Sequence, residues 1–148
     1  MKISTKGRYG LRILMDLAIH HSEKPRLIRD IAKSQQISEK YISRLVIALR
    51  KAGMIRSVRG VNGGFHIAMK PEDITLLDVI EVMEGPLSIV DCVSTPKSCA
   101  KSGNCAPREI WCKLNGEIRD LMRGITLADI LASYDRQKAR DGMTDYCI

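Results

Sequence analysis

Three cysteines within fourteen residues are the side chains of this sequence best suited to chemistry. Cys92, Cys99 and Cys105 have the spacing C-x6-C-x5-C. The residues between them include Pro96, Gly103 and small polar side chains, a composition that favours turns over helix or strand. Apolar burial cannot hold such a polar loop in place, so either it is disordered or its thiols bind something. The loop is therefore a candidate metal or redox site.

The absence of a recognisable leader sequence or membrane segment bears on the state of these thiols. The apolar stretch 11–19 is interrupted by Arg12 and Asp16, which suits an amphipathic helix and not a secretory signal. No run approaches the roughly 20 apolar residues that a membrane span needs. We therefore expect a cytoplasmic protein without membrane contact, in which thiols stay reduced. Under these conditions, clustered cysteines indicate metal or redox chemistry over structural disulfides.

Two kinds of metal group are compatible with three cysteines. Iron–sulfur clusters bind thiolates, typically four, with histidine or carboxylate as occasional substitutes. Structural zinc sites also use three cysteines and one further ligand, but they favour C-x2-4-C pairs, which this sequence lacks. Gaps of six and five residues favour a broad loop around a larger object. Three reduced cysteines with no metal are the remaining alternative.

Other residues could supply a fourth ligand. Cys112 falls one to two turns into a predicted helix, where a small packing residue is the simpler interpretation. Cys147 is next to the C-terminus and is expected to be free. His20 and His21 end the first predicted helix, a position at which histidines commonly cap the helix C-terminus.

The charge of the chain is distributed unevenly. At 148 residues, 45% of them apolar, the chain can form one domain with a sizeable core. Residues 1–70 contain fifteen Lys/Arg and four Asp/Glu, a net +11, whereas residues 71–148 contain nine and thirteen, a net −4. A globular chain with one strongly basic half usually meets a polyanion there. The alternative is an ordinary solvated basic surface.

The basic half predicts a helix-turn-helix. Ser4 can cap a helix over about 5–22, and a short helix is expected over about 27–34. Ser38 can cap a third helix that ends at Gly53. One face of this third helix is apolar at helical spacing, through Ile42, Leu45, Val46 and Leu49. Its other face is polar and basic, as in a recognition helix.

A glycine-rich hairpin is predicted to follow directly. The runs MIRSV and FHIAM resemble short strands on either side of RGVNGG, whose glycines permit the positive φ angles of a hairpin tip. A helix-turn-helix followed at once by a basic hairpin is the order of a winged helix. Arg56 and Arg59 would lie on this wing.

The second half predicts an appended dimerisation element. Thr75 and Asp78 can form a capping box for a helix over about 75–84. Beyond the cysteine loop, a helix over about 107–123 has a broad apolar face, which we expect to contact a second subunit. Packing onto its own domain is the alternative. Thr126 can cap a last short helix to about Ser133, followed by a polar, flexible tail.

By these features the sequence closely resembles the IscR-like regulators, bacterial winged-helix transcription factors of the Rrf-two family. The resemblance rests on KGRYGLR in the first helix together with RSVRGVNGGF on the hairpin, and it covers about residues 1–132. It implies a homodimer that binds double-stranded DNA and dimerises through a long helix. Members with three cysteines in this loop bind an iron–sulfur cluster that tunes DNA binding, whereas cysteine-free relatives work without one.

The resemblance implies Cys92, Cys99 and Cys105 as cluster ligands. The best-known pattern has a histidine three residues after the last cysteine, where this chain has Arg108, which stays protonated and cannot ligate. Other members draw a ligand from the first helix, where this chain carries arginines, Arg8 and Arg12. We therefore expect an iron–sulfur cluster, 2Fe–2S in preference to 4Fe–4S, with its fourth ligand unassigned.

Seven residues are predicted to contact DNA. We expect Lys40, Ser43 and Arg44 in the major groove, because arginine paired with guanine is the commonest specific contact. Arg59 would reach a phosphate or the minor groove. Lys6, Arg8 and Lys51 would contact phosphates, which position the protein without specifying sequence. For each, a solvated surface charge is the alternative.

The predicted fold class is mainly α with a small β-hairpin, a winged helix-turn-helix domain plus a long dimerisation helix. Residues 1–85 form the DNA-binding domain, 86–106 the cluster-binding loop, 107–133 the dimerisation and short C-terminal helices, and 134–148 the tail. No Ser/His/Asp set, paired carboxylates or phosphate-binding glycine loop suggests catalysis, so we do not expect an enzyme. A redox or metal protein that does not bind DNA is the alternative function.

Overall fold

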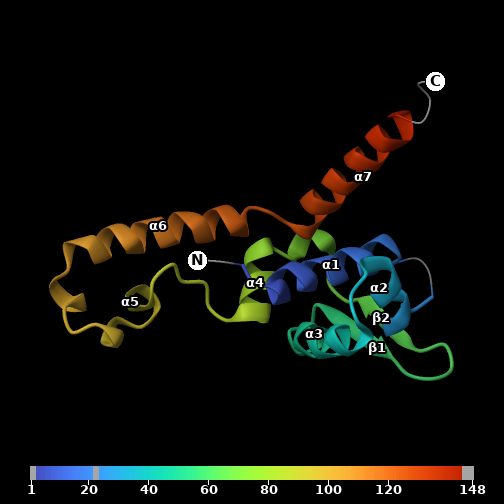
Figure 1. The fold of residues 1–148 in the computed structure, drawn as a ribbon, viewed down its shortest axis with the longest axis horizontal. Helices are drawn as coiled ribbons and strands as arrows, with labels where there is room; N and C mark the ends of the chain where they lie inside the picture. Colours follow the sequence, from blue (N-terminus) through green and yellow to red (C-terminus); the bar gives the residue numbers. More distant parts are fainter. Residues whose placement is uncertain (1–2, 22–23, 145–148) are drawn as a thin grey trace.

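The computed structural model describes residues 3–21 and 24–144, which are mainly helical with one two-stranded hairpin (Figure 1). This is the predicted fold class, a winged helix followed by a long helix. Cys147 lies outside the described residues. The elements, in chain order, are α1 (Thr5–Ile19), α2 (Ile28–Gln35), α3 (Glu39–Lys51), β1 (Ile55–Val58), β2 (Gly64–Ile67), α4 (Leu76–Glu84), α5 (Asp91–Ser94), α6 (Ala106–Arg123) and α7 (Leu127–Thr144).

The predicted helix caps of the first 85 residues are confirmed. The hydroxyl of Ser4 accepts a hydrogen bond from Lys6 N, and Ser38 does the same from Tyr41 N. Thr75 and Asp78 form the expected capping box at the start of α4. Capping oxygens at these positions satisfy backbone N–H groups that have no partner within the helix, and they fix where each helix begins.

Helices α1 to α4 enclose one apolar core. Each contributes side chains at helical spacing, and the inward face of α3 is the predicted one. Burial of these faces is the main force that holds the body together. Fully or nearly fully buried members include Ile13, Leu14, Leu17, Ile31, Ile42, Leu45, Leu49, Ile55, Ile74 and Val79.

Two glycines let α1 and α4 approach each other closely. A Cβ atom at Gly10 would lie 2.7 Å from Met83 Cγ, and one at Gly7 would lie 2.5 Å from Glu84 Oε1. The same Glu84 carboxylate accepts hydrogen bonds from Ser4 N at 2.8 Å and Gly7 N at 3.2 Å. The end of α4 therefore supplies a negative charge to the N-terminus of α1, where the helix dipole favours it.

A buried carboxylate connects α1 to the helix-turn-helix. Asp16, only 2% exposed, pairs with Arg26 through Oδ2–Nε at 3.0 Å. Its other oxygen accepts hydrogen bonds from Ser34 Oγ and from Gln35 Nε2 at the end of α2. A buried charge costs little only when it is paired and hydrogen-bonded, and Asp16 meets both conditions. Of the two residues that interrupt the apolar stretch of α1, Asp16 is thus buried inside the domain.

The hairpin has the predicted antiparallel pairing, with Ile55 opposite Ile67 and Val58 opposite Gly64. Arg26 adds a bridge, because it exchanges backbone hydrogen bonds with Phe65 at 3.0 and 2.9 Å. Gly64 has φ +149°, and a Cβ there would lie 2.6 Å from the Arg26 carbonyl oxygen. A glycine is needed at this position, and Arg26 joins the wing to the Asp16 network.

Helix α6 leaves this body and extends to the side opposite the wing, with the cysteine loop folded beneath its far end (Figure 1). The loop contains the one-turn helix α5 and two 3₁₀ turns, Pro96–Ser98 and Ser102–Asn104. The expectation of turns without helix was therefore wrong at Cys92, which lies in α5. No helix in the described ranges is long and apolar enough to cross a membrane.

The last helix is longer than predicted. We expected it to end near Ser133, with a tail beyond, but α7 continues to Thr144. Thr126 and Asp129 hydrogen-bond reciprocally at its start, as in a capping box. The sequence from 134 to 141 holds no proline or glycine and is rich in arginine, lysine, alanine and glutamine, which favour helix. The polar composition of this segment was compatible with an exposed helix as well as with a tail.

Candidate DNA-binding face and cysteine loop

The exposed face of α3 carries the residues predicted to read DNA. Lys40, Arg44 and Lys51 are exposed, and Ser43 is half-buried with its hydroxyl donating to the Glu39 carbonyl at 2.8 Å. The spacing of these side chains places them opposite the buried stripe of α3. One basic helix face is therefore presented to solvent, as a recognition helix requires.

The start of α1 lies beside the start of α3. The hydroxyls of Thr5 and Tyr41 are 3.3 Å apart, and the rings of Tyr9 and Tyr41 meet edge to face at 5.8 Å between centroids. Lys6 and Arg8, which flank this contact in sequence, are both exposed. The structure thus brings the first turn of α1 to the N-terminal end of the recognition helix.

The wing carries further exposed arginines. Arg59 lies at the hairpin tip, and Arg56 is on β1. Two more exposed arginines that sequence reasoning did not single out are Arg29 on α2 and Arg50 on α3. Their exposure follows from the helical periodicity of α2 and α3. The sequence contains this periodicity, but it does not show which basic residues face solvent until the buried faces are known.

The three loop cysteines are placed along the path from α5 to α6. Cys92 is in α5, Cys99 follows the first 3₁₀ turn, and Cys105 is the N-cap residue of α6. All three are free thiols, as is Cys112. Among the described residues, no three His, Cys, Asp or Glu side chains are gathered closely enough to hold a metal ion. Cysteine thiols are the donors that an iron–sulfur cluster uses, but in this conformation the three thiols do not converge on one metal site.

Residues 87–92, called the strap below, connect α4 to the cysteine loop and run antiparallel to α6. The strap is tied to α6 by side chains of that helix, which bond to its backbone. The three bonds join Arg119 Nη1 to the Leu87 carbonyl at 3.5 Å, Ile89 N to Asn115 Oδ1 at 3.0 Å, and Arg108 Nε to the Cys92 carbonyl at 2.9 Å.

The side of α6 that faces the strap is a single helical stripe. Its members recur every three or four residues, and none is exposed, whereas most of the other residues of α6 are. Arg108, found where the family pattern has a histidine, thus has a structural role, since it holds the backbone of a cysteine. The stripe comprises Cys105, Arg108, Cys112, Asn115, Arg119 and Met122.

Glu81 on α4 joins the body to the strap and to α6. It forms an ion pair with Arg119, and its Oε1 accepts a hydrogen bond from Leu87 N at 3.0 Å. Partial burial opposes ionisation of Glu81, but the bonds from Arg119 and Leu87 outweigh it, so the pKa of Glu81 lies below its ordinary value. Sequence reasoning did not find this contact, because Glu81 and Arg119 are 38 residues apart.

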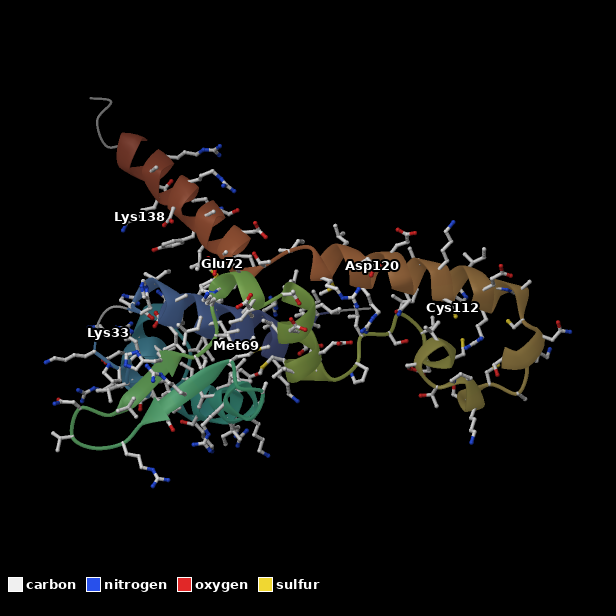
Figure 2. All side chains as sticks on the ribbon, turned by 180° about the vertical axis from the view of Figure 1, so that it is seen from behind. Lys33, Met69, Glu72, Cys112, Asp120 and Lys138 are labelled. Carbon is white, nitrogen blue, oxygen red and sulfur yellow. The ribbon has the colours of Figure 1, made fainter. Side chains whose placement is uncertain are left out.

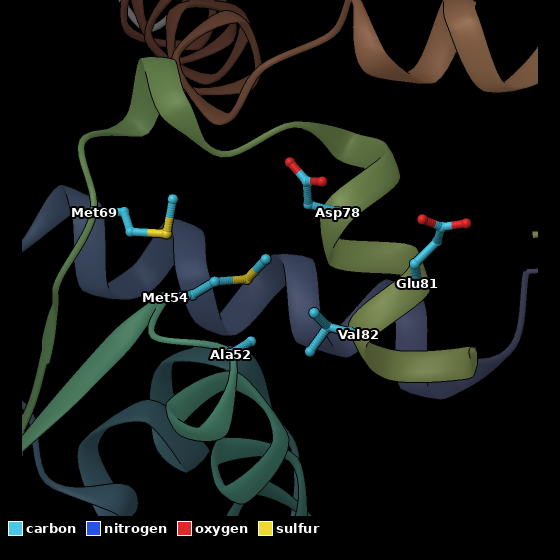
Figure 3. A pocket seen from close by; sticks show the side chains of 6 residues that line it. All are labelled: Ala52, Met54, Met69, Asp78, Glu81 and Val82. Atoms are coloured by element: carbon cyan, nitrogen blue, oxygen red, sulfur yellow. The ribbon is translucent and has the colours of Figure 1, made fainter. Parts of the chain in front are cut away.

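A groove of about 490 Å³ lies beside Glu81, between α4 and the end of α3 (Figure 3). Met54, Met69 and Val82 give it apolar walls, and Asp78 and Glu81 lie on its α4 side. Both carboxylates already have partners, Asp78 in the capping box and Glu81 in the ion pair. These two groups therefore hold α4 in place and are not free charges for a ligand.

The opposite face of α6 is apolar and open. Ile110 is 61% exposed and Leu121 68% exposed, and Trp111 and Leu114 are exposed with them. Of this helix, Met122 is buried in a small apolar cluster with Leu77, Ile80 and Leu87. Within the described residues, the predicted apolar face is therefore divided: Met122 and Ile118 pack onto the chain's own domain, whereas the exposed four do not.

The fold and the basic face together define a winged-helix DNA-binding regulator. The Rrf2 family model, described as an iron-dependent transcriptional regulator, matches residues 3–133. The chain belongs to this family. CymR of Bacillus subtilis is 41% identical over 134 residues, which are 90% of this chain and 91% of that protein.

Solved structures support the same assignment. The structure of CymR, the global cysteine regulator of B. subtilis, has a TM-score of 0.76 at 38% identity and covers 90% of this chain and 98% of its own. T. potens IscR has a TM-score of 0.72 at 37% identity, covering 90% of this chain and 88% of its own. The relatives thus include a protein titled as a cysteine regulator and one named IscR, and the winged-helix fold is common to both.

Proposed function

We propose that the chain is a homodimeric regulator in which residues 86–106 hold an iron–sulfur cluster that controls DNA binding by residues 1–85. The observation that carries this proposal is the strap. Cys92, the first loop cysteine, is tied to α6 through Arg108, and the same strap begins at Leu87, which is tied to the body through Glu81. A change at the cysteines therefore has a continuous route to the DNA-binding body.

The DNA contacts follow from the exposed basic face. Lys40, Ser43 and Arg44 enter the major groove from α3, and Arg59 reaches the adjacent backbone or minor groove from the wing. Phosphate contacts come from the residues at the two ends of this face, Lys6, Arg8 and Lys51.

The dimer forms through the apolar side of α6, within residues 107–133. Large exposed apolar side chains in a row mark a surface that is covered in the working molecule. A second copy of the same helix is the occupant, since a two-fold axis then places two recognition helices on half-sites about one helical turn apart. Replacement of Leu121 by glutamate is expected to give a monomer, measured by light scattering, and a dimer of unchanged affinity would contradict this interface.

Cys92, Cys99 and Cys105 would hold the cluster, 2Fe–2S in preference to 4Fe–4S. When bound, such a group would supply a charge that changes with its redox state, and its bonds to the cysteines would be lost if oxidation destroyed it. Lys97, Lys101 and Arg108 stand near these residues in sequence, and their positive charges would offset the negative charge of a thiolate-bound cluster. Binding must draw the loop cysteines together, because they are not gathered in the described conformation.

A second candidate is a thiol-based regulator that binds DNA without a cluster. Two observations favour it: the open arrangement of the cysteines and the likeness to CymR, whose structure is titled as that of a global cysteine regulator. Zinc in place of the cluster is a variant of this candidate. The cluster, the zinc site and the metal-free thiols all make the cysteine loop the site that senses the signal. They differ in what binds the thiols.

The DNA reading is tested by fluorescence anisotropy on a promoter fragment at several salt concentrations. Affinity should fall with a slope of roughly −0.9 in log–log form per phosphate neutralised. Arg44→Ala should cost about 1–3 kcal/mol of binding free energy. Lys113→Ala, which removes the same charge from exposed α6, should leave affinity unchanged. A salt-independent affinity would contradict DNA binding through this face.

The cluster reading is tested by anaerobic purification with visible absorption and iron and sulfide analysis. Substitution of Cys92, Cys99 or Cys105 by alanine should abolish the colour in each case, whereas Cys147→Ala should not. A colourless protein that contains zinc only, or no metal, would contradict the cluster and leave the thiol-based candidate.

A further inference from the structure

Cys112 lies on the strap side of α6, not on its apolar side. From Glu109 to Leu114 it is the residue that is not exposed, while Trp111 beside it is exposed. Its neighbours on the stripe are Arg108 and Asn115, one turn to either side, and both bond to the strap. Figure 2 shows Cys112 where α6 passes over the cysteine loop. Cys112 was expected to be a small packing residue, and its place on the strap side puts it next to the side chains that bond the strap.

The same side of α6 places Cys112 beside Cys105, the last of the loop cysteines. Cys105 and Cys112 line one hollow of about 530 Å³, together with Arg108 and Glu109. Cys105 is two turns from Cys112 on the stripe. Arg108 lies between the two in sequence and holds the Cys92 carbonyl at 2.9 Å. Cys105 and Cys112 thus share a hollow with Arg108, which bonds the backbone of Cys92, and Cys99 is the exposed member of the loop cysteines.

The other donors of the chain are less well placed. His20 and His21 are at the end of α1, where each Nδ1 lies within hydrogen-bond distance of a backbone carbonyl, Asp16 O at 2.8 Å and Ala18 O at 3.0 Å. This is the predicted capping role. Arg108 cannot ligate. Glu109 also lines the hollow, but its carboxylate is a harder ligand than a thiolate for iron in a sulfur site.

We propose that Cys112 is the fourth ligand of the cluster, with Cys92, Cys99 and Cys105 as the other three. The inference rests on the proposed function. Cys112 would hold iron through its Sγ, with the thiol proton released to solvent, and the loop cysteines would have to approach the strap side of α6. A four-thiolate set would then anchor the loop to the helix that we propose forms the dimer, without a histidine in the position occupied by Arg108.

The test compares four variants of the full chain after anaerobic reconstitution with ferrous iron and sulfide. They are Cys112→Ala, Cys112→Ser, Glu109→Gln as the matched control for the competing donor, and Cys99→Ala as the reference for a lost ligand. The readouts are iron content, visible absorption, the electron paramagnetic resonance spectrum of the reduced protein, and the rate of iron release to a chelator. Circular dichroism melting confirms that each variant is folded.

The expected result is that Cys112→Ala changes the visible and resonance spectra and releases iron at least about tenfold faster, while Glu109→Gln matches the wild type. Cys112→Ser, which retains an oxygen donor, should slow the release relative to alanine. A Cys112→Ala protein with wild-type spectra and release rate, alongside a colourless Cys99→Ala, would overturn the assignment and leave the proposed function intact. A wild-type protein that binds no iron would overturn both.

Discussion

The winged-helix body (α1 to α4 with the hairpin) and the arm (the strap, the cysteine loop and α6) are held by different forces. In the body, every helix buries at least one apolar side chain completely and contributes to one shared core. In the arm, α6 buries only Asn115 and Met122 in the described structure, and the strap is held mainly by hydrogen bonds to polar side chains of α6. Apolar burial gives the body its stability, whereas the arm can rearrange at a small cost. This division suits a protein in which a DNA-binding body of fixed shape is joined to a sensing arm whose shape can change.

Substitution of Asp16 should give the largest loss of stability in the winged-helix body. In Asp16→Asn, Arg26 keeps its charge but loses its buried partner, and Ser34 and Gln35 lose a charged acceptor. Removal of one member of a buried pair typically costs about 3–5 kcal/mol. We expect a loss of that size in the free energy of unfolding, measured by urea denaturation at one fixed protein concentration.

The matched control for Asp16 is Asp120→Asn, which breaks the exposed ion pair with Arg123 on α6. Exposed pairs contribute about 0–1 kcal/mol, so this variant should unfold close to the wild-type midpoint. Equal effects of the two substitutions would contradict the distinction between a tightly determined body and a loosely held arm.

The same substitution should have opposite signs in the two regions. Gly10→Ala places a Cβ 2.7 Å from Met83 Cγ in the α1–α4 contact, and overpacking of this kind typically costs about 1–3 kcal/mol. Gly116→Ala, on α6, meets nothing within 4 Å and should stabilise by roughly 0.5–1 kcal/mol through helix propensity. Thermal unfolding of both variants measures the contrast. A stabilised Gly10→Ala protein would show that the body tolerates separation of its helices.

The sequence was sufficient where the structure depends on local patterns. Ser4, Ser38 and Thr75 mark helix starts through capping, and the apolar period of α3 identifies the face left for DNA. These signals act within a few residues, and a single sequence contains them. The end of α7 was missed because the polar composition of residues 134–141 is compatible with an exposed helix as well as with a tail.

Contacts between distant residues were beyond such reasoning. The hydrogen bonds between Asn115 and Ile89 and between Arg108 and Cys92 join residues 26 and 16 positions apart. No periodic pattern in the sequence predicts such contacts. From the sequence, Arg108 was only a residue that cannot ligate at the position where a ligand was expected. Its bond to the strap shows a structural role. The cysteines themselves were found by type and spacing, while the side of α6 that carries Cys112 required the packing of the strap.

Glu81 tests the joint between the two regions, and its effect should be the smallest. In Glu81→Gln, Arg119 loses an anionic partner and Leu87 N keeps a weaker acceptor, so we expect a loss of about 1 kcal/mol at neutral pH. Because the folded pKa of Glu81 is depressed, its contribution is complete above the ordinary value of 4.5 and is lost as the pH falls through the folded pKa. The difference between wild type and variant, measured by urea unfolding, should therefore shrink below about pH 4.5. Glu117→Gln, on the exposed side of α6, should show no such convergence. A difference independent of pH would mean that the carboxylate charge does not hold the strap to the body, and that the route from the cysteine loop to α4 lies elsewhere.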